Sequence, residues 1–282
     1  MLGCGFAPSS YYEARFRGPS ARARRDEELK QVIAAEYDEN YRAYGVRKMW
    51  LHLRGEKGLE VARDTVCRLM RILGLQGARR GKAKRTTFAD PAAARAKDLV
   101  KRNFRPLAPN KLWVADFTYV STLAGWVYVA FVIDAYARRV LGWKVSTSMT
   151  TDLVLDAINQ AIFTRRREGV KDFSGIIHHN DAGSQYTSVR FTERLLEVGI
   201  DASIGVVGDA HDNSLAESIN GLYKTELIKP RRPWRNAGHV EAETAAYLDW
   251  FNNRRLYEYC GDMPPARLEQ IYYGNLGTIE VA

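Results

Sequence analysis

The sequence predicts an α/β catalytic core preceded by a small all-α domain. Residues 26–75 repeat apolar side chains at helical spacing, whereas residues 111–205 alternate short apolar strands with helices. Charge is also uneven, because residues 1–110 hold 24 lysines and arginines against 12 acidic residues, and residues 111–282 hold 18 against 21. A basic front half joined to a slightly acidic rear half favours a region that grips DNA followed by a core that bears carboxylates.

Three helices are expected in the first domain, residues 1–78. The apolar positions that carry the pattern are Leu29, Val32, Ile33 and Tyr37, then Val46, Met49, Trp50 and Leu53, then Val66, Leu69, Met70 and Leu73. Gly55-Glu56-Lys57-Gly58 breaks the pattern, and Gly74 is expected to close the third helix. Two short helices around a glycine turn are typical of a helix-turn-helix, whose second helix would present Arg63, Arg68 and Arg71 to DNA. The alternative is a three-helix packing module that does not contact DNA.

Residues 79–108 are expected to form a basic linker or arm. Within them, residues 79–105 hold ten basic and two acidic residues with little periodicity. We expect this arm to lie on DNA phosphates, although a solvated tether has the same composition. Its candidate contacts are Arg79, Arg80, Lys82, Lys84 and Arg85.

The core is expected over residues 109–270, with residues 271–282 as a C-terminal tail. Strands are predicted at 114–120, 127–133 and 140–145, in an antiparallel meander, and at 176–179 and 202–204. Helices are predicted at 151–167, 188–198, 214–228 and 240–252. Pro264-Pro265 is expected to stop further helix. This order of elements is that of an RNase H-like fold.

Three carboxylates, Asp116, Asp181 and Glu217, stand out as candidate catalytic residues and metal ligands. Asp116 shares a strand face with Val114 and Val120, so it does not lie on a plain solvent face. Asp181 comes just past the end of a strand, which is where α/β sheets place ligands. Glu217 lies on a helix, and 35 residues separate it from Asp181. Two aspartates at strand ends and a glutamate on a helix can converge on one point.

Oxygen-only ligands on a basic chain favour Mg²⁺. Two such ions can clamp the attacking and leaving oxygens of a phosphodiester exchange, so the first hypothesis is metal-dependent cutting and joining of DNA. Each acid also has a structural alternative. Asp116 can be an ion-paired strand residue, and Glu217 can complete a capping box with Ser214.

Several other polar residues have structural explanations that we favour. Asp134 ends a strand and opens a turn, which Asp does by bonding the backbone two residues on. His178 and His179 point to opposite faces of a strand, so we expect them to belong to the core. Lys224 lies on the face of Glu217 and either reaches substrate phosphate or is solvated. Arg254 and Arg255 follow a helix and either contact DNA or interact with the helix dipole.

The motifs around the acids resemble those of a known family. The segments in family order are Trp113 to Tyr119, Asp134 to Arg139, Gly183 to Ser188, Asp212-Asn213 and Trp250 to Arg255. Together with the 35-residue spacing, they resemble the D,D(35)E signature of bacterial insertion-sequence transposases, in particular the second-frame (OrfB-type) product of the "IS three" family. Tyr44 to Lys48 and Arg68-Leu69-Met70 extend the resemblance to nearly the whole chain.

The resemblance implies a retroviral-integrase-like core that cleaves DNA and transfers strands at the ends of an insertion sequence. It implies two Mg²⁺ ions, with Mn²⁺ as a substitute, and DNA partners in the form of terminal inverted repeats and target DNA. A first-frame (OrfA-type) product or fusion and a homo-oligomer on DNA are further expected partners. Asn180, Ala182, His211 and Tyr257 depart from the family pattern, and residues 205–211 resemble its flexible active-site loop. The rival hypothesis is an idle DNA-binding remnant or regulator.

Composition limits the other classes of function. The longest apolar runs are short, so no membrane span is expected, and the N-terminus lacks the layout of a signal peptide. Cys4, Cys67 and Cys260 are far apart and odd in number, which indicates neither a disulfide framework nor a zinc site. A reducing cytoplasm is therefore expected, and the resemblance implies a bacterial protein associated with the nucleoid.

Overall fold

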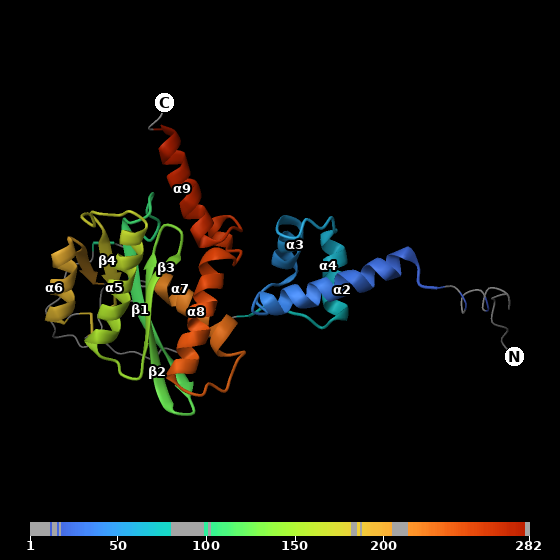
Figure 1. The fold of residues 1–282 in the computed structure, drawn as a ribbon, viewed down its shortest axis with the longest axis horizontal. Coiled ribbons are helices and arrows are strands. Elements are labelled where there is room, and N and C mark those ends of the chain that lie inside the picture. The colour runs from blue at the N-terminus through green and yellow to red at the C-terminus, as the bar shows by residue number, and fades with distance from the viewer. Residues whose placement is uncertain are drawn as a thin grey trace. The chain divides into compact units, whose positions relative to one another are not determined.

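The computed structural model describes residues 18–79, 99–100, 103–181, 185–186, 188–204 and 214–279, together with Tyr12 and Phe16. The chain divides into two compact units, Met1–Ala78 and Arg79–Ala282. Figure 1 shows the helical first unit in blue and the α/β second unit in green to red. Each unit has its own hydrophobic core, and the two are described separately.

The first unit holds three helices, as its apolar spacing predicts. They are α2 (Ala21–Glu39), α3 (Val46–Gly55) and α4 (Arg63–Ile72). The side chains buried between them are Leu29, Ile33, Tyr44, Met49, Leu53, Val66, Leu69 and Met70. Gly74 follows α4 with φ of 68°, a left-handed backbone that favours glycine, so the predicted end of the third helix is confirmed.

The second unit is built on a five-stranded sheet in the order β3-β2-β1-β4-β5. The central strand β1 (Leu112–Thr122) pairs antiparallel with β2 (Gly125–Asp134), which pairs antiparallel with β3 (Arg139–Ser146). On its other side β1 pairs parallel with β4 (Ile177–Asn180), which pairs parallel with β5 (Asp201–Ile204). The predicted meander is therefore confirmed, and the strand order is that of an RNase H-like sheet.

Helices cover both faces of this sheet (Figure 1). On one face lie α5 (Thr151–Arg167) and α6 (Val189–Val198), whose apolar side chains join those of the sheet in one core cluster. On the other lie α7 (Ser214–Tyr223) and α8 (Ala237–Asn253), and the Tyr223 ring packs 5.1 Å from that of Phe131 on β2. A π-helical turn, η1 (Lys224–Ile228), extends α7, and the short η2 (Glu258–Cys260) follows α8.

One glycine determines how closely α5 lies on the sheet. A Cβ on Gly142 of β3 would lie 2.1 Å from the carbonyl oxygen of Ala157, closer than any real side chain. The α5 backbone therefore rests directly on β3, where only glycine leaves room.

The last helix, α9 (Pro265–Ile279), corrects one prediction. Pro264-Pro265 was expected to stop further helix, but Pro265 is the first residue of α9. Proline suits this position, because a first-turn N–H has no partner within the helix and the ring presets φ. The expected tail, residues 271–282, begins inside this helix.

A buried ionic network ties α9 to the sheet. Arg165 of α5 donates from Nη2 to Asp134 Oδ2 at 2.8 Å and to Glu269 Oε1 of α9 at 2.7 Å. Asp134 Oδ1 accepts the Tyr136 N–H at 2.9 Å, which confirms the predicted turn. Burial raises the Asp134 pKa, as does Glu269, while Arg165 opposes the shift. The structure thus gives Asp134 an architectural role.

Candidate active site

The register of the sheet brings Asp116 and Asp181 to one place. The parallel pairing of β1 with β4 ends at Ala115 opposite Asn180. Asp116 and Asp181 each follow that last pair by one residue. The carboxyl end of β4 and the middle of β1 therefore present the two aspartates side by side.

Asp116 is held by hydrogen bonds to both carboxylate oxygens. Its Oδ1 accepts the Phe117 N–H at 2.8 Å, and its Oδ2 accepts from Nδ2 of Asn220, on α7, at 2.8 Å. Both bonds favour the charged form, yet the pKa of Asp116 is raised to about 8. Atoms packed around the carboxyl desolvate it, although the side chain keeps some exposed surface, and the charges of Asp181 and Glu217 add to the shift.

Glu217 lies in the first turn of α7 and is exposed. Asn220 is three residues later on the same helical face, so its bond to Asp116 directs this face of α7 toward β1. The helix begins at Ser214, and the preceding residue, Asn213, lies outside the described residues. The capping-box alternative for Glu217 therefore stays a prediction.

The donor chemistry of this site fits a divalent cation. Asp181 and Glu217 raise the pKa of Asp116, so their negative charges disfavour a third charge at this point, whereas a bound cation would favour the charged form. Their ligands would all be oxygen, as Mg²⁺ prefers. Within the described ranges, no three His, Cys, Asp or Glu side chains are already gathered closely enough to hold an ion. Residues 182–184 and 205–213, next to the site in sequence, lie outside those ranges.

His178 and His179 belong to the core, as their alternation predicts. His179 Nδ1 lies 2.9 Å from Ser203 Oγ on β5, and the His178 ring packs edge-on against Phe191 of α6 at 5.3 Å. Burial lowers the pKa of His178 to about 3, and His179 adds to the shift, so the ring is neutral near pH 7.

The structure separates the expected DNA contacts into different environments. Arg63, Arg71 and Arg79 are exposed, whereas Arg68 bonds Asp26 at 2.8 Å. Arg254 is exposed, with Nη2 3.3 Å from Asp249 Oδ2. The remaining arm residues, Arg80, Lys82, Lys84 and Arg85, lie outside the described residues.

For Arg255 the expectation of DNA contact is wrong. The side chain is 3% exposed and forms a two-pronged ion pair with Glu226, with Nη2 2.6 Å from Oε1 and Nε 2.9 Å from Oε2. Glu226 also accepts from the Tyr247 hydroxyl at 2.9 Å. The arginine is therefore part of the core between η1 and α8.

Lys224 interacts both with Asp116 and with an exposed aromatic ring. Its Nζ is 4.7 Å from the centroid of Tyr119, and burial lowers its pKa while Asp116 opposes the shift. Sequence reasoning missed a second set of cations that follows it. These are Lys229, Arg231, Arg232 and Arg235, all exposed between η1 and α8. The density of basic residues between 229 and 235 was the available signal.

Two departures from the family pattern have local explanations. Asn180 is buried and donates from Nδ2 to the Asp181 carbonyl at 2.6 Å, which holds the backbone where Asp181 leaves the sheet. The Tyr257 ring lies 5.0 Å from the Arg255 guanidinium, so it packs on the core. Ala182, His211 and the loop at 205–211 lie outside the described residues.

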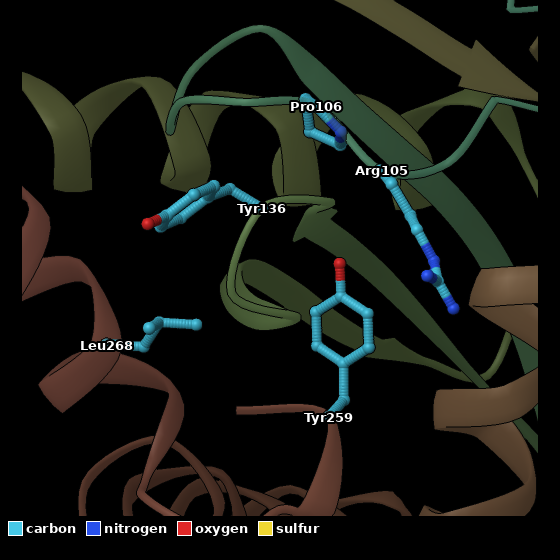
Figure 2. A pocket seen from close by; sticks show the side chains of 5 residues that line it. All are labelled: Arg105, Pro106, Tyr136, Tyr259 and Leu268. Atoms are coloured by element: carbon cyan, nitrogen blue, oxygen red, sulfur yellow. The ribbon is translucent and has the colours of Figure 1, made fainter. Parts of the chain in front are cut away.

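A separate pocket of 420 Å³ lies beside the turn that follows β2 (Figure 2). Its lining residues are Arg105, Pro106, Tyr136, Tyr259 and Leu268. Since none of the three acids is among them, the pocket is distinct from the candidate active site.

A mixed five-stranded sheet with acids at the β1–β4 edge defines a core of the integrase type. Family models agree, because an integrase core domain matches residues 106–210, a second integrase core model matches residues 198–265, and an HTH-like domain matches residues 24–83. Within the described residues, no helix is both long and apolar enough to cross a bilayer.

Two relatives are similar over nearly their whole length. The putative transposase for insertion sequence element IS986/IS6110 of Mycobacterium tuberculosis (strain ATCC 25177 / H37Ra) is 63% identical over 267 residues, which cover 95% of this chain and 96% of the relative. The transposase for insertion sequence element IS629 of Shigella sonnei is 50% identical and covers 98% of this chain, with 92% of the relative matched. The chain therefore belongs to the "IS three" family of insertion-sequence transposases.

Among solved structures, the HTLV-2 integrase catalytic core domain in complex with magnesium (trimeric form) is 20% identical with a TM-score of 0.43. The match covers 58% of this chain and 99% of that domain.

Proposed function

We propose that Asp116, Asp181 and Glu217 form the DDE catalytic site of this transposase, where it cuts and joins DNA at the ends of its insertion sequence. The observation that carries the proposal is Asp116, whose pKa is raised by desolvation and by the other two acids while Asn220 holds its carboxylate in place. An architectural acid such as Asp134 instead has an arginine partner at 2.8 Å.

The three carboxylates would hold two Mg²⁺ ions, for which Mn²⁺ can substitute. Bound there, the ions would act as Lewis acids that activate the attacking oxygen and stabilise the leaving oxygen. Asn220 fixes the orientation of Asp116, and the Asn180 bond to the Asp181 carbonyl fixes the end of β4. Lys224, which interacts electrostatically with Asp116, would contact the phosphate being attacked.

The reaction has two in-line exchanges at phosphorus. In the first, water attacks the phosphodiester at the end of the element, and the bond to the 3′ oxygen breaks to leave a 3′-hydroxyl. In the second, that hydroxyl attacks a phosphodiester of another strand, and the displaced oxygen takes up a proton. No covalent bond between protein and DNA is needed.

The remaining parts of the chain would bind the substrate. The domain division proposed here is a helix-turn-helix-like region at 1–78, a basic arm at 79–108 and the catalytic core from 109. Arg63 and Arg71 are exposed on α4, where a recognition helix presents its contacts. The proposed partners are the terminal inverted repeats, target DNA, a first-frame product and further copies of this chain.

The test is nicking of a labelled terminal-repeat duplex with Mg²⁺, Mn²⁺ or no divalent ion. Wild-type protein should nick only with a divalent ion, and Asp116→Asn, Asp181→Asn and Glu217→Gln should each abolish nicking. The matched control is Glu241→Gln, which changes an exposed glutamate on α8 and should cut normally. Cleavage by folded Glu217→Gln would leave that residue only the capping role. Binding of the repeat without nicking by wild type would favour the rival regulator.

A further inference from the structure

A rigid surface lies at the tip of the β1–β2 hairpin. The Leu123 N–H donates to the Trp234 carbonyl at 2.8 Å, and the Ala124 N–H donates to the Arg235 carbonyl at 3.2 Å. Thr122 also forms a parallel β-bridge with Trp234. Backbone bonds therefore fix the 229–236 loop against the hairpin.

The buried side chain of Trp234 anchors this loop to the core. This side chain is 1% exposed, and its Nε1 donates to the Ile228 carbonyl at 2.9 Å. The cations of the loop are exposed to solvent. They are Lys229, Arg231, Arg232 and Arg235. Arg231 pairs with Glu243, and the other three cations still give the loop a net positive charge. A basic loop held by its backbone can meet a polyanion with little ordering cost.

Two large aromatic side chains are exposed on the same hairpin. Trp126 is 56% exposed and Tyr119 is 38% exposed, and their rings meet edge to face at 5.3 Å. The Lys224 ammonium lies over the Tyr119 ring, 4.7 Å from its centroid. Exposed aromatic rings beside cations are the arrangement by which proteins stack nucleic-acid bases and neutralise the adjoining phosphates.

The surface begins at the candidate active site. Along one edge, β1 pairs with β4 only as far as Ala115 and meets Trp234 again at Thr122. Between these points, no other described strand pairs with that edge. Tyr119 is three residues beyond Asp116, and Thr122 six residues, so the open edge extends about 10 to 20 Å from the acid.

We propose that this surface, the hairpin platform, binds single-stranded DNA next to the cut. The platform consists of Tyr119, Trp126 and the 229–236 loop. Trp126 stacks on an unpaired base, and Lys229, Arg232 and Arg235 contact the phosphates. The chemistry of the surface matches the occupant in charge and in stacking, since a paired duplex offers no free base face along its side. The inference rests on the proposed function only for the position of the cut.

Binding without divalent ions tests the platform, because it does not require cleavage. The full chain is titrated with a terminal-repeat duplex that is fully paired and with one whose last bases are unpaired. Trp126→Ala should weaken binding of the unpaired end about 5-fold to 150-fold, the range for losing one base–aromatic stack, and change the paired duplex far less. Trp126→Phe should restore most of the affinity. The matched control is Phe163→Ala, which removes an aromatic side chain that is 60% exposed on α5.

Salt dependence tests the cations of the platform. The double variant Arg232→Ala/Arg235→Ala should reduce the slope of log affinity against log salt by about 1.4, or 0.7 for each single-strand phosphate contact. The control double variant Arg167→Ala/Lys171→Ala removes two exposed cations near the end of α5 and should change the slope less. Equal effects of the two double variants, or no loss of unpaired-end affinity in Trp126→Ala, would overturn the proposal.

The outcomes separate this inference from the proposed function. If wild type fails to nick but its preference for the unpaired end depends on Trp126, the platform stands and the catalytic proposal fails. If wild type nicks normally and Trp126→Ala binds both substrates like wild type, the catalytic proposal stands and the platform fails.

Discussion

The side-chain amide of Asn220 donates to Oδ2 of Asp116 across 2.8 Å and so joins α7 to β1. Asn220 is 7% exposed, and the Glu217 on the same helical face is the third candidate acid. The bond therefore has two consequences, because it orients one carboxylate and fixes the helix that carries another. In metal sites, a hydrogen-bond partner of this kind orients the ligand and thereby affects metal affinity and activity.

Replacing Asn220 should impair cleavage without unfolding the protein. Asn220→Ala should lower cleavage about 10-fold to 100-fold, because the Asp116 carboxylate loses its orienting donor. It should also raise the Mg²⁺ concentration needed for half-maximal rate, which loss of packing alone would not do. The control Asn159→Ala changes an exposed amide on α5 and should leave both quantities unchanged. An unaltered Mg²⁺ requirement in Asn220→Ala would count against the positioning role.

Asp116→Asn should stabilise the protein when no divalent ion is present. Desolvation and the neighbouring Asp181 and Glu217 make the charged form of Asp116 unfavourable. A neutral amide of the same shape removes that cost, so we expect a gain of at least about 1 kcal/mol in unfolding free energy at neutral pH. Adding Mg²⁺ should raise the melting temperature of wild type but not of the variant. Thermal unfolding with EDTA or Mg²⁺ measures both effects, and a less stable variant under EDTA would contradict this electrostatic account.

Acid should loosen the first unit through Glu36. Its carboxylate is nearly buried, and burial raises its pKa, but bonds from Lys57 at 2.5 Å and His52 at 2.7 Å outweigh that effect and leave the pKa lowered. A lowered pKa means that the stabilisation is present above the usual value of about 4.5 and is lost as the pH falls through the folded value. Hydrogen exchange of the α2–α4 amides in the full chain, corrected for intrinsic exchange, should therefore become faster as the pH falls below the pKa of glutamate in the unfolded chain.

Glu36→Gln should be less stable near pH 7 and should lose much of this acid dependence. Glu39→Gln, at an exposed position one turn later on α2, is the matched control and should behave like wild type. The same acid dependence in Glu36→Gln as in wild type would exclude Glu36 as its source.

Arg254 and Arg255 should contribute very differently to stability despite being neighbours. Arg255→Ala leaves Glu226 buried without its guanidinium partner, so it should cost about 3–5 kcal/mol in unfolding free energy. Arg254→Ala removes an exposed side chain and should change stability by less than about 0.5 kcal/mol. Urea unfolding of both variants tests the contrast. If Arg255→Ala weakened DNA binding at unchanged stability, its assignment to the core would be wrong.

The sequence by itself was enough to predict most elements of both units, with α9 as an exception, and to single out the three acids. Hydrophobic periodicity reports local burial, so the helix at 151–167 and the β1–β3 meander could be recognised from neighbouring residues alone. The 35-residue spacing and the motif around Asp116 pointed to the acids, and the sheet register then placed Asp116 beside Asp181.

Only the tertiary structure decided which polar side chains meet across the chain. Asn220 lies 104 residues from Asp116, and Arg255 lies 29 residues from Glu226, so no local pattern could pair them. The docking of the 229–236 loop on the hairpin and the pairing of Glu269 on α9 with Arg165 likewise depend on partners distant in sequence. The physical reason is that periodicity shows that a residue is buried, whereas the partner of a buried charge or amide is set by how the elements pack.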